Sequence, residues 1–379
     1  MPSPARFAAD LAALTAGAVV VCAVGTSLIR TLLIPRGRPS PLVRCVDRAV
    51  DGTFRTLTRP LTRYGTRDTV LAAQAPTTLL LQLLTWLALA AGGFALLLLP
   101  VTRSPHTALR EAASSLLTLG FTSTHGWWAT VTDAAAAVTG LVVIALQIAY
   151  LPMLYGAFNR RETDVTLLAV RAGEPAWGPE LLARTHFGFL GMDLATFYGS
   201  WERWAADIAE SHVSYPVLLR FRSPRPLGSW LVGLVAVLDA AAMHLATCPQ
   251  QAPVQARLCL RMGFICLRRL ARATELPVDE DPRPDGPLEL GEDEFREGYQ
   301  RLVAIGFPVE RSAEQAWPHF RGWRVNYEAA AYALARELDA VPARWTGPRR
   351  WTVAPLDPVR PPNRTPEDPG GSARTPADA

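Results

Sequence analysis

The sequence contains no lysine, so all 38 basic residues of this 379-residue chain are arginine. This absence excludes a Walker-type phosphate-binding loop, a lysine Schiff base and a lysine general base. Cysteine is also scarce: the five residues form no CxxC pair and predict neither a disulfide framework nor a zinc site. The GxGxxG and HExxH motifs are missing as well. We therefore expect a protein that is not an enzyme, without catalytic residues or a cofactor.

Three long stretches in the first 160 residues are almost free of charge. They are Leu11–Ile34, which contains only Arg30, then Thr77–Pro100 and Ala134–Phe158. At 1.5 Å per residue, a helix over the first stretch is about 36 Å long, enough for a bilayer core of about 30 Å. A cleavable signal peptide is the alternative for this stretch, but its apolar run is too long for one. The sequence therefore predicts three transmembrane helices.

Arginine is concentrated between the first two apolar stretches, and this bias predicts the orientation. Eight arginines lie there with three carboxylates, whereas the next connection holds only two arginines. Arginine-rich loops stay on the cytoplasmic side. We predict a multi-pass cell-membrane protein with its N-terminus outside and its C-terminal region cytoplasmic. Four arginines at every fourth position predict a basic stripe for anionic lipid, interrupted by Pro60, with a solvated loop as the alternative. They are Arg55, Arg59, Arg63 and Arg67.

The segment between the second and third apolar stretches begins like a short helix. Ser104 is a candidate N-cap, and Pro105 occupies the first helical position. The helical pattern stops at Thr118, just before Gly120. A helix of roughly 12 residues is too short to cross a bilayer but can enter it halfway and return. The alternative is an amphipathic helix on the membrane surface, with Gly120 as its C-cap.

The residues that follow this short helix resemble the pore loop of potassium channels. Thr118-Leu119-Gly120-Phe121 is similar to the first four positions of the filter pattern T-x-G-[YF]-G, and it lies between two apolar stretches as the filter does. The stretches that begin at 160, 201 and 229 also resemble bacterial potassium-channel-like membrane proteins, so the likeness covers roughly residues 70–250. The resemblance implies that backbone carbonyls coordinate a permeant potassium ion, and that four chains assemble as a homotetramer around it.

The loop departs from the family pattern at its next position. Thr122 stands where the second filter glycine is found, and Ser123 where an aspartate often follows. Threonine resists the left-handed backbone that glycine adopts freely. The resemblance therefore implies a monovalent cation channel without assured potassium selectivity. The alternative is a membrane-anchored helical signalling or scaffold protein whose pore loop is degenerate and does not conduct.

The third apolar stretch has features expected of an inner pore helix. Gly140 and Pro152 are candidate gating hinges, because glycine is flexible and proline removes a helical hydrogen bond. Gln147 is polar at membrane depth, which predicts a pore-lining position. Close helix packing is the alternative role for Gly140, and a hydrogen bond to a neighbouring helix is the alternative for Gln147.

Beyond residue 160 the sequence predicts a cytoplasmic, helical region. Periodic apolar residues indicate helices over 193–211, 257–272, 289–305 and 327–338. Ser229–Thr247 is apolar throughout except for Asp239 and His244, so we predict a buried core helix, with a fourth span as the alternative. Arginines are nearly balanced by acidic residues, so we expect no nucleic-acid partner. The predicted organisation is a first span and basic linker, a pore domain, a helical domain, a second helical segment and a disordered Pro-rich tail: 1–76, 77–160, 161–275, 276–345 and 346–379.

Overall fold

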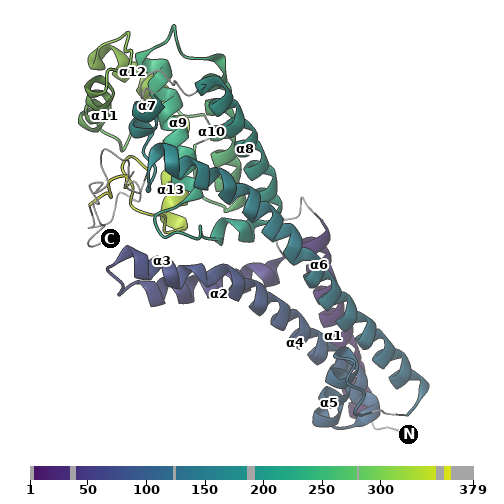
Figure 1. Ribbon diagram of the computed structural model, residues 1–379. Helices are drawn as coiled ribbons and strands as arrows, with labels where there is room; N and C mark the ends of the chain where they lie inside the picture. Colours follow the sequence, from purple (N-terminus) through teal and green to yellow (C-terminus); the bar gives the residue numbers. More distant parts are fainter. Residues whose placement is uncertain are drawn as a thin grey trace. The chain divides into compact units, whose positions relative to one another are not determined.

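A computed structural model of the protein describes residues 4–34, 40–122, 125–185, 193–279, 281–346 and 354–359. Within these ranges every regular element is a helix, and only two isolated β-bridges are present (Figure 1). The predicted all-α class is therefore confirmed. The chain divides into two compact units. Unit 1 comprises Met1–Thr56 and Ala73–Gly156, and unit 2 comprises Leu57–Ala72 and Ala157–Ala379.

Each predicted span lies inside a long helix. Helix α1 covers Pro4–Leu28 and continues as a short π-helix, η1, over Ile29–Leu33. Helix α4 covers Gln74–Thr102, and α6 covers Trp127–Ala172. By length and composition, four segments of the described chain are candidate spans of a multi-pass membrane protein. They are Pro4–Leu33, Tyr64–Thr102, Trp127–Ala172 and Trp230–Thr247.

Two glycines allow α1 and α4 to approach each other closely within unit 1. A Cβ atom added to Gly17 would lie 2.7 Å from the carbonyl oxygen of Gly93. A Cβ atom added to Gly93 would lie 2.9 Å from a methyl group of Val21. Small residues at a helix crossing allow the two backbones to approach closely, so that van der Waals contacts hold the helices together. The α1–α4 pair is therefore built on backbone contact.

Buried hydrogen bonds attach helix α2, Pro41–Thr58, to the same pair of helices. The hydroxyl groups of Ser27 and Ser40 lie 2.6 Å apart, and the Trp86 indole donates to Ser27 over 3.0 Å. These bonds satisfy the polar groups at the junction of α1, α2 and α4. Two amide-to-carboxylate bonds of 2.7 Å add to this attachment: Gln82 to Asp47 and Gln74 to Asp51.

The four arginines predicted to form one stripe do not share a helix. Helix α2 ends at Thr58, and α3 begins at Tyr64 and ends at Ala72, so Pro60 does separate two elements. Arg55 lies in the last turn of α2, whereas Arg59 and Arg63 are exposed in the connection. The guanidinium of Arg67, on α3, bonds to Asp339 within unit 2. A continuous basic stripe over these positions is therefore wrong.

Unit 2 is a helical domain with well-capped elements. Asp193, Ser229 and Ser312 accept hydrogen bonds from the first backbone N–H groups of α8, α9 and α12, respectively. Helices α7 and α12 were not expected from the sequence. Besides α3 and the last part of α6, the described helices of unit 2 are α7 Gly178–Thr185, α8 Leu194–Ser214, the 3-10 helix η2 Pro216–Arg220, α9 Trp230–Thr247, α10 Val254–Ala273, α11 Glu292–Ala304, α12 Ala313–Arg324 and α13 Glu328–Glu337.

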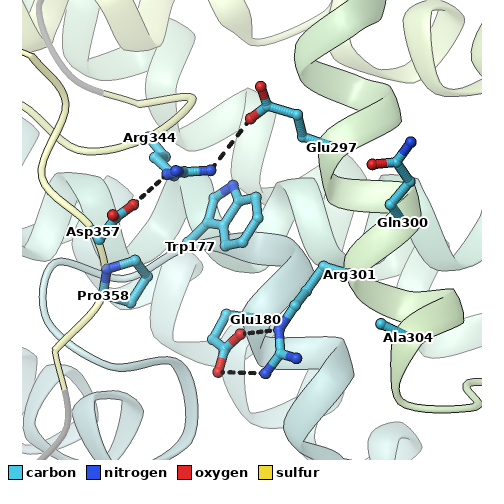
Figure 2. Close-up of a pocket in the computed structure, with 9 residues that line it drawn as sticks. All are labelled: Trp177, Glu180, Glu297, Gln300, Arg301, Ala304, Arg344, Asp357 and Pro358. Atoms are coloured by element: carbon cyan, nitrogen blue, oxygen red, sulfur yellow. Dashed lines mark hydrogen bonds and ion pairs between the residues drawn. The ribbon is translucent and has the colours of Figure 1, made fainter.

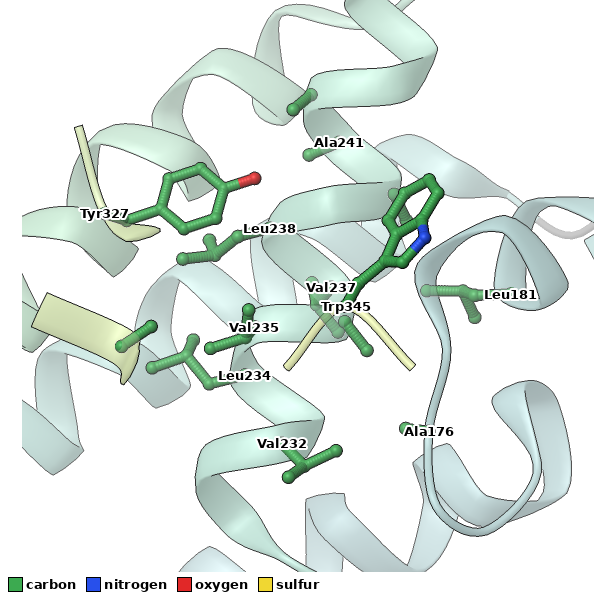
Figure 3. Close-up of a cluster of buried hydrophobic side chains, with 14 of the residues drawn as sticks. Ala176, Leu181, Val232, Leu234, Val235, Val237, Leu238, Ala241, Tyr327 and Trp345 are labelled. Carbon is green, nitrogen blue, oxygen red and sulfur yellow. The ribbon is translucent and has the colours of Figure 1, made fainter. Parts of the chain in front are cut away.

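Helix α9 is the centre of the unit 2 core. Every residue from Trp230 to Thr247 is buried, and α9 contacts α7, α8, α10, α12 and α13. Figure 3 shows Leu234 and Leu238 of α9 among side chains from distant parts of the chain, including Tyr327 and Trp345. A helix that is apolar on all sides needs apolar surroundings on all sides. This burial agrees with the predicted core helix.

One charged network lies inside this core. The guanidinium of Arg324, on α12, is fully buried and bonds to the carboxylates of Asp239 and Glu328. Its remaining N–H groups donate to the Tyr332 hydroxyl at 2.9 Å and the Trp345 carbonyl at 2.6 Å. A buried charge is tolerated when opposite charges and hydrogen bonds surround it. Arg324 therefore allows Asp239 to occupy the middle of an apolar helix.

The described part of the Pro-rich tail, 354–359, packs against unit 2. Leu356 donates its N–H to Pro342 over 2.8 Å. Val359 exchanges two backbone hydrogen bonds with Glu174, of 2.9 and 3.1 Å. Residues 354–359 therefore depart from the prediction that 346–379 is disordered. Thr346, the first residue of the predicted tail, is buried. Residues 347–353 and 360–379 lie outside the described residues.

Candidate pore loop and a charged cavity

The helix predicted before the filter-like residues is present as α5, Pro105–Leu116. Ser104 caps it, with its hydroxyl accepting from the Thr107 N–H over 3.4 Å, and Pro105 occupies the first turn. In unit 1, α5 packs against α4, burying Ala108 and Ala112. The sequence prediction of both the helix and its start is confirmed.

The end of α5 forms a tight C-terminal turn. The Thr118 N–H donates to the Ser115 carbonyl over 3.0 Å, and the Leu119 N–H donates to the Ser114 carbonyl over 2.8 Å. This pair of bonds is the Schellman arrangement, which needs a left-handed residue just after the helix. Thr118 holds that position, with φ of 54°. The structure therefore places Thr118, and not Gly120, at the left-handed end of the helix.

The next residues fold back on the same serine. Gly120 is also left-handed, with φ of 69°. The N–H of Phe121 then donates to the buried Ser114 hydroxyl over 3.1 Å. The Phe121 ring lies 5.4 Å from the Arg110 guanidinium of α5. Ser114 thus accepts hydrogen bonds from two N–H groups of the loop, one with its carbonyl and one with its hydroxyl. No local sequence signal predicted this role.

The carbonyl groups of the filter-like residues differ from the N–H groups in their hydrogen bonding. The carbonyl oxygens of Thr118, Leu119, Gly120 and Phe121 accept no hydrogen bond from the residues that the structure describes. All four residues are exposed in the single chain, including 60% of Leu119 and 51% of Phe121. Thr122 follows them half-buried, and Ser123 lies outside the described residues. Within the described residues, the loop therefore combines exposed residues with peptide oxygens that have no hydrogen-bond partner.

Gly140 of α6 supports the end of α5. A Cβ atom at this position would lie 1.8 Å from the Leu116 carbonyl oxygen, far inside contact distance. The hydroxyl of Ser115 donates to the Asp133 carboxylate over 2.8 Å, a second link between α5 and α6. Gly140 thus has a packing role, which is one of the two roles that the sequence left open.

The other two positions predicted on α6 lie on opposite sides of the helix. Gln147 is buried, with 7% of its surface exposed, and its Oε1 has no hydrogen-bond partner among the described residues. This burial within the single chain favours the alternative role of Gln147, packing against a neighbouring helix, and the pore-lining position stays a prediction. Pro152 is exposed within a helix that continues unbroken to Ala172. Gln147 belongs to a buried stripe with a spacing of three or four residues: Ala129, Thr132, Ala136, Gly140, Val143, Gln147, Tyr150 and Leu154.

A cavity of about 490 Å³ lies in unit 2, far in the sequence from the filter-like loop. Figure 2 shows two ion-paired arginines on either side of the Trp177 indole. Arg301 bonds to Glu180, and Arg344 bonds to Glu297 at 3.3 Å and to Asp357. The cavity is lined by Trp177, Glu180, Glu297, Gln300, Arg301, Ala304, Arg344, Asp357 and Pro358. These residues come from four separate parts of the sequence, so no local motif predicted them.

Across the described ranges, no group of three or more His, Cys, Asp or Glu side chains could hold a metal ion. The buried thiols of Cys259 and Cys266 have pKa values raised by burial, so they are poor nucleophiles at neutral pH. No family model matches the chain, and neither a curated protein nor a solved structure matches it.

Proposed function

We propose that the protein is a potassium-channel-like monovalent cation channel in which each chain contributes one pore loop. The loop is the α5 helix followed by Thr118–Phe121, and four copies of the chain surround one ion pathway. The observation that carries the proposal is the hydrogen bonding of the loop backbone: the N–H groups of Leu119 and Phe121 bond to Ser114, whereas the carbonyl oxygens of the exposed residues Thr118–Phe121 accept no hydrogen bond from the described residues. Backbone carbonyls in a ring are the groups that replace the hydration shell of a monovalent cation.

The helix before the loop adds to this electrostatic argument. The C-terminal end of a helix carries roughly half a negative charge, and in α5 this end lies directly before Thr118. Both that partial charge and the exposed carbonyls attract a cation. The contact between Gly140 and Leu116 fixes the end of α5 against the following helix. Potassium is then the permeant species and not a bound cofactor.

The exposed side of α6 supports assembly with further copies. One stripe of α6 is buried inside its own chain, whereas apolar side chains on its other sides are exposed. Such a surface needs lipid or a second protein surface to cover it. In a tetramer, neighbouring loops and α6 helices cover part of it and lipid covers the rest. The exposed residues are Val131, Val138, Leu141, Val142, Ile144, Ile148 and Met153.

In this proposal α1, α4 and the first part of α6 cross the membrane, and α5 with its loop is re-entrant. The N-terminus lies outside and unit 2 is cytoplasmic, as the arginine bias favours. Helix α9 does not cross, because its whole surface is already buried in unit 2. Exposed Arg55, Arg59 and Arg63 remain candidates for anionic lipid.

Ion flux from liposomes tests the proposal. The purified full chain in liposomes should release potassium or sodium down a gradient. Gly120→Ala should reduce the flux by at least about tenfold, because alanine is strained at the positive φ of this position. Gly92→Ala is the matched control, since a Cβ atom there meets nothing within 4 Å. Cross-linking should give a tetramer. A dimer, or no flux under either gradient, would contradict the channel.

A membrane-anchored scaffold protein is the second candidate, and Thr122 is the observation that favours it. Threonine replaces the glycine whose flexibility keeps the last filter carbonyls pointing inward. A degenerate loop of this kind could retain the fold and the tetramer without conducting. Fourfold assembly with no flux, in the wild type and in Thr122→Gly alike, would identify the scaffold. Flux that appears only in Thr122→Gly would identify a filter blocked at this single position.

A further inference from the structure

Among the described residues, the cavity of unit 2 contains a buried donor, the Trp177 indole, without an acceptor. Trp177 is 7% exposed, and its indole Nε1 has no hydrogen-bond partner among the described residues. Figure 2 shows this nitrogen on the edge of the ring that faces Arg344 and Glu297. The Arg344 guanidinium lies 5.1 Å from the centre of the same ring. An acceptor placed beside this edge would therefore meet a neutral N–H and a positive charge together.

The carboxylates of the cavity wall differ in how firmly they are held. The Glu180 side chain is 11% exposed and bonds to two arginines, Arg184 and Arg301. Burial raises its pKa, but the hydrogen bonds from Arg301 and Arg184 outweigh burial, and the pKa of Glu180 is lowered. Glu180 is therefore a fixed anion of the wall. It compensates the arginines beside it, and no ligand is needed to do so.

The two carboxylates on Arg344 are far more exposed. Glu297 is 61% exposed and Asp357 is 72% exposed, whereas the Arg344 side chain is only 33% exposed. Asp357 is carried by the short tail segment 354–359, which is attached through isolated bridges at Leu356 and Val359. Exposed ion pairs contribute little to stability. A competing anion could therefore replace these carboxylates without disturbing the core.

We propose that this cavity binds a small organic anion, whose carboxylate or phosphate group takes the place of Asp357 on Arg344 and accepts the Trp177 N–H. An apolar body on the ligand would lie against Ala304 and Pro358, which line the same cavity. The site is widely open to solvent, and its volume of about 490 Å³ is large enough for a small molecule. In the free protein, Asp357 is the internal occupant of the anion position, so the ligand competes with the tail.

Titration of the full chain in detergent with three probes tests this site. Benzoate represents a carboxylate with an apolar body, inorganic phosphate represents the phosphate source, and benzamide is the neutral match to benzoate. We expect saturable binding of benzoate, phosphate or both by calorimetry, and none of benzamide. Which anion binds more tightly identifies the ligand class. The measurement involves no ion flux, so its outcome is independent of the channel proposal.

Four variants make the prediction specific to this cavity. Asp357→Asn should tighten anion binding at least about threefold, because it removes the internal competitor. Arg344→Gln should weaken binding at least about tenfold, and Trp177→Phe, which keeps an aromatic ring but lacks the N–H, severalfold. Arg283→Gln is the control, since this arginine is 84% exposed and lies outside the cavity.

Several results would overturn the site. Binding that none of the three cavity variants changes identifies an adventitious ion only. Equal binding of benzamide and benzoate contradicts recognition of charge. Absence of saturable binding in both the wild type and Asp357→Asn contradicts the site outright, because the variant no longer has the Asp357 carboxylate that competes with the ligand. Asp357→Asn changes an exposed side chain and keeps this comparison available even if Arg344→Gln fails to fold.

Discussion

The two units of this chain bury apolar helices in opposite ways. In the most apolar 18-residue stretch of the α1 segment, 11% of the residues are buried. The corresponding value for α6 is 28%. The corresponding stretch of α9 is buried completely in unit 2. Unit 1 brings backbones together at glycines and leaves wide apolar surfaces outside. Unit 2 encloses its apolar helix and pairs the carboxylate on that helix, Asp239, with the buried Arg324. Composition alone does not distinguish a lipid-facing helix from a core helix. The difference lies in how completely neighbouring helices cover the apolar surface.

The largest expected effect concerns the buried charge network of unit 2. Arg324→Gln leaves Asp239 and Glu328 buried without their cation, which should destabilise the unit by about 3–5 kcal/mol. Thermal unfolding of the full chain measures it. Arg336→Gln is the control, since it removes an exposed pair with Glu289 and should change stability by about 0–1 kcal/mol. Equal effects of the two variants would mean that burial does not set the strength of these pairs.

The next effect concerns backbone contact in unit 1. Gly140→Ala places a methyl group against the Leu116 carbonyl, and overpacking of this kind should destabilise the unit by about 1–3 kcal/mol. Unfolding monitored in detergent measures the loss. Gly25→Ala, where nothing lies within 4 Å of the added methyl group, should be neutral or slightly stabilising. A neutral result for Gly140→Ala would contradict the close approach of α5 and α6.

A smaller effect is expected at the serine that holds the loop. Ser114→Ala removes the hydroxyl that accepts the Phe121 N–H but keeps the backbone bond to Leu119, so the loss should be about 1 kcal/mol. Hydrogen exchange is the sensitive measurement: the Phe121 amide should exchange faster while the Leu119 amide changes little. Similar acceleration at both amides would show that the loop opens as one piece.

The smallest effect is a pH dependence at Glu180. Its pKa is lowered because hydrogen bonds from Arg301 and Arg184 outweigh burial. A lowered pKa means that the carboxylate stabilises the fold above the ordinary glutamate pKa, and that this stability is lost as the pH falls from there through the lowered pKa. Glu180→Gln should therefore be less stable than the wild type at pH 7, and the difference should shrink at acid pH. Unfolding at a series of pH values measures it, and a constant difference would contradict the assignment.

The sequence predicted the features that depend on neighbouring residues. Uncharged runs located α1, α4 and α6, and the Ser104–Pro105 signal located the start of α5. It also indicated that Ser229–Thr247 is a core helix, because Asp239 would be costly within a bilayer. These features follow from local composition and capping, which need no knowledge of distant contacts.

The features that the sequence did not predict depend on contacts that have no local sequence signal. The alternative interpretation made Gly120 the C-cap of this helix, yet the two bonds of the helix end place Thr118 at that left-handed position. Gln147 is polar at membrane depth, but only the packing of α6 shows that it is buried within its own chain. Helix α12, with Pro318 inside it, gave no clear helical pattern. The cavity in unit 2 combines residues more than 100 positions apart, such as Trp177 and Arg301.

Helix α6 is a single 46-residue element, about 69 Å long at 1.5 Å per residue. Its hydrogen-bond ladder continues past Gly156, where unit 1 ends, to the fully buried Arg161, which donates to the carbonyls of Leu218 and Phe221. An unbroken helix resists torsion about its own axis. Arg161 and Gly140, the glycine against which α5 packs, are therefore joined by 21 residues of continuous helix with no intervening loop.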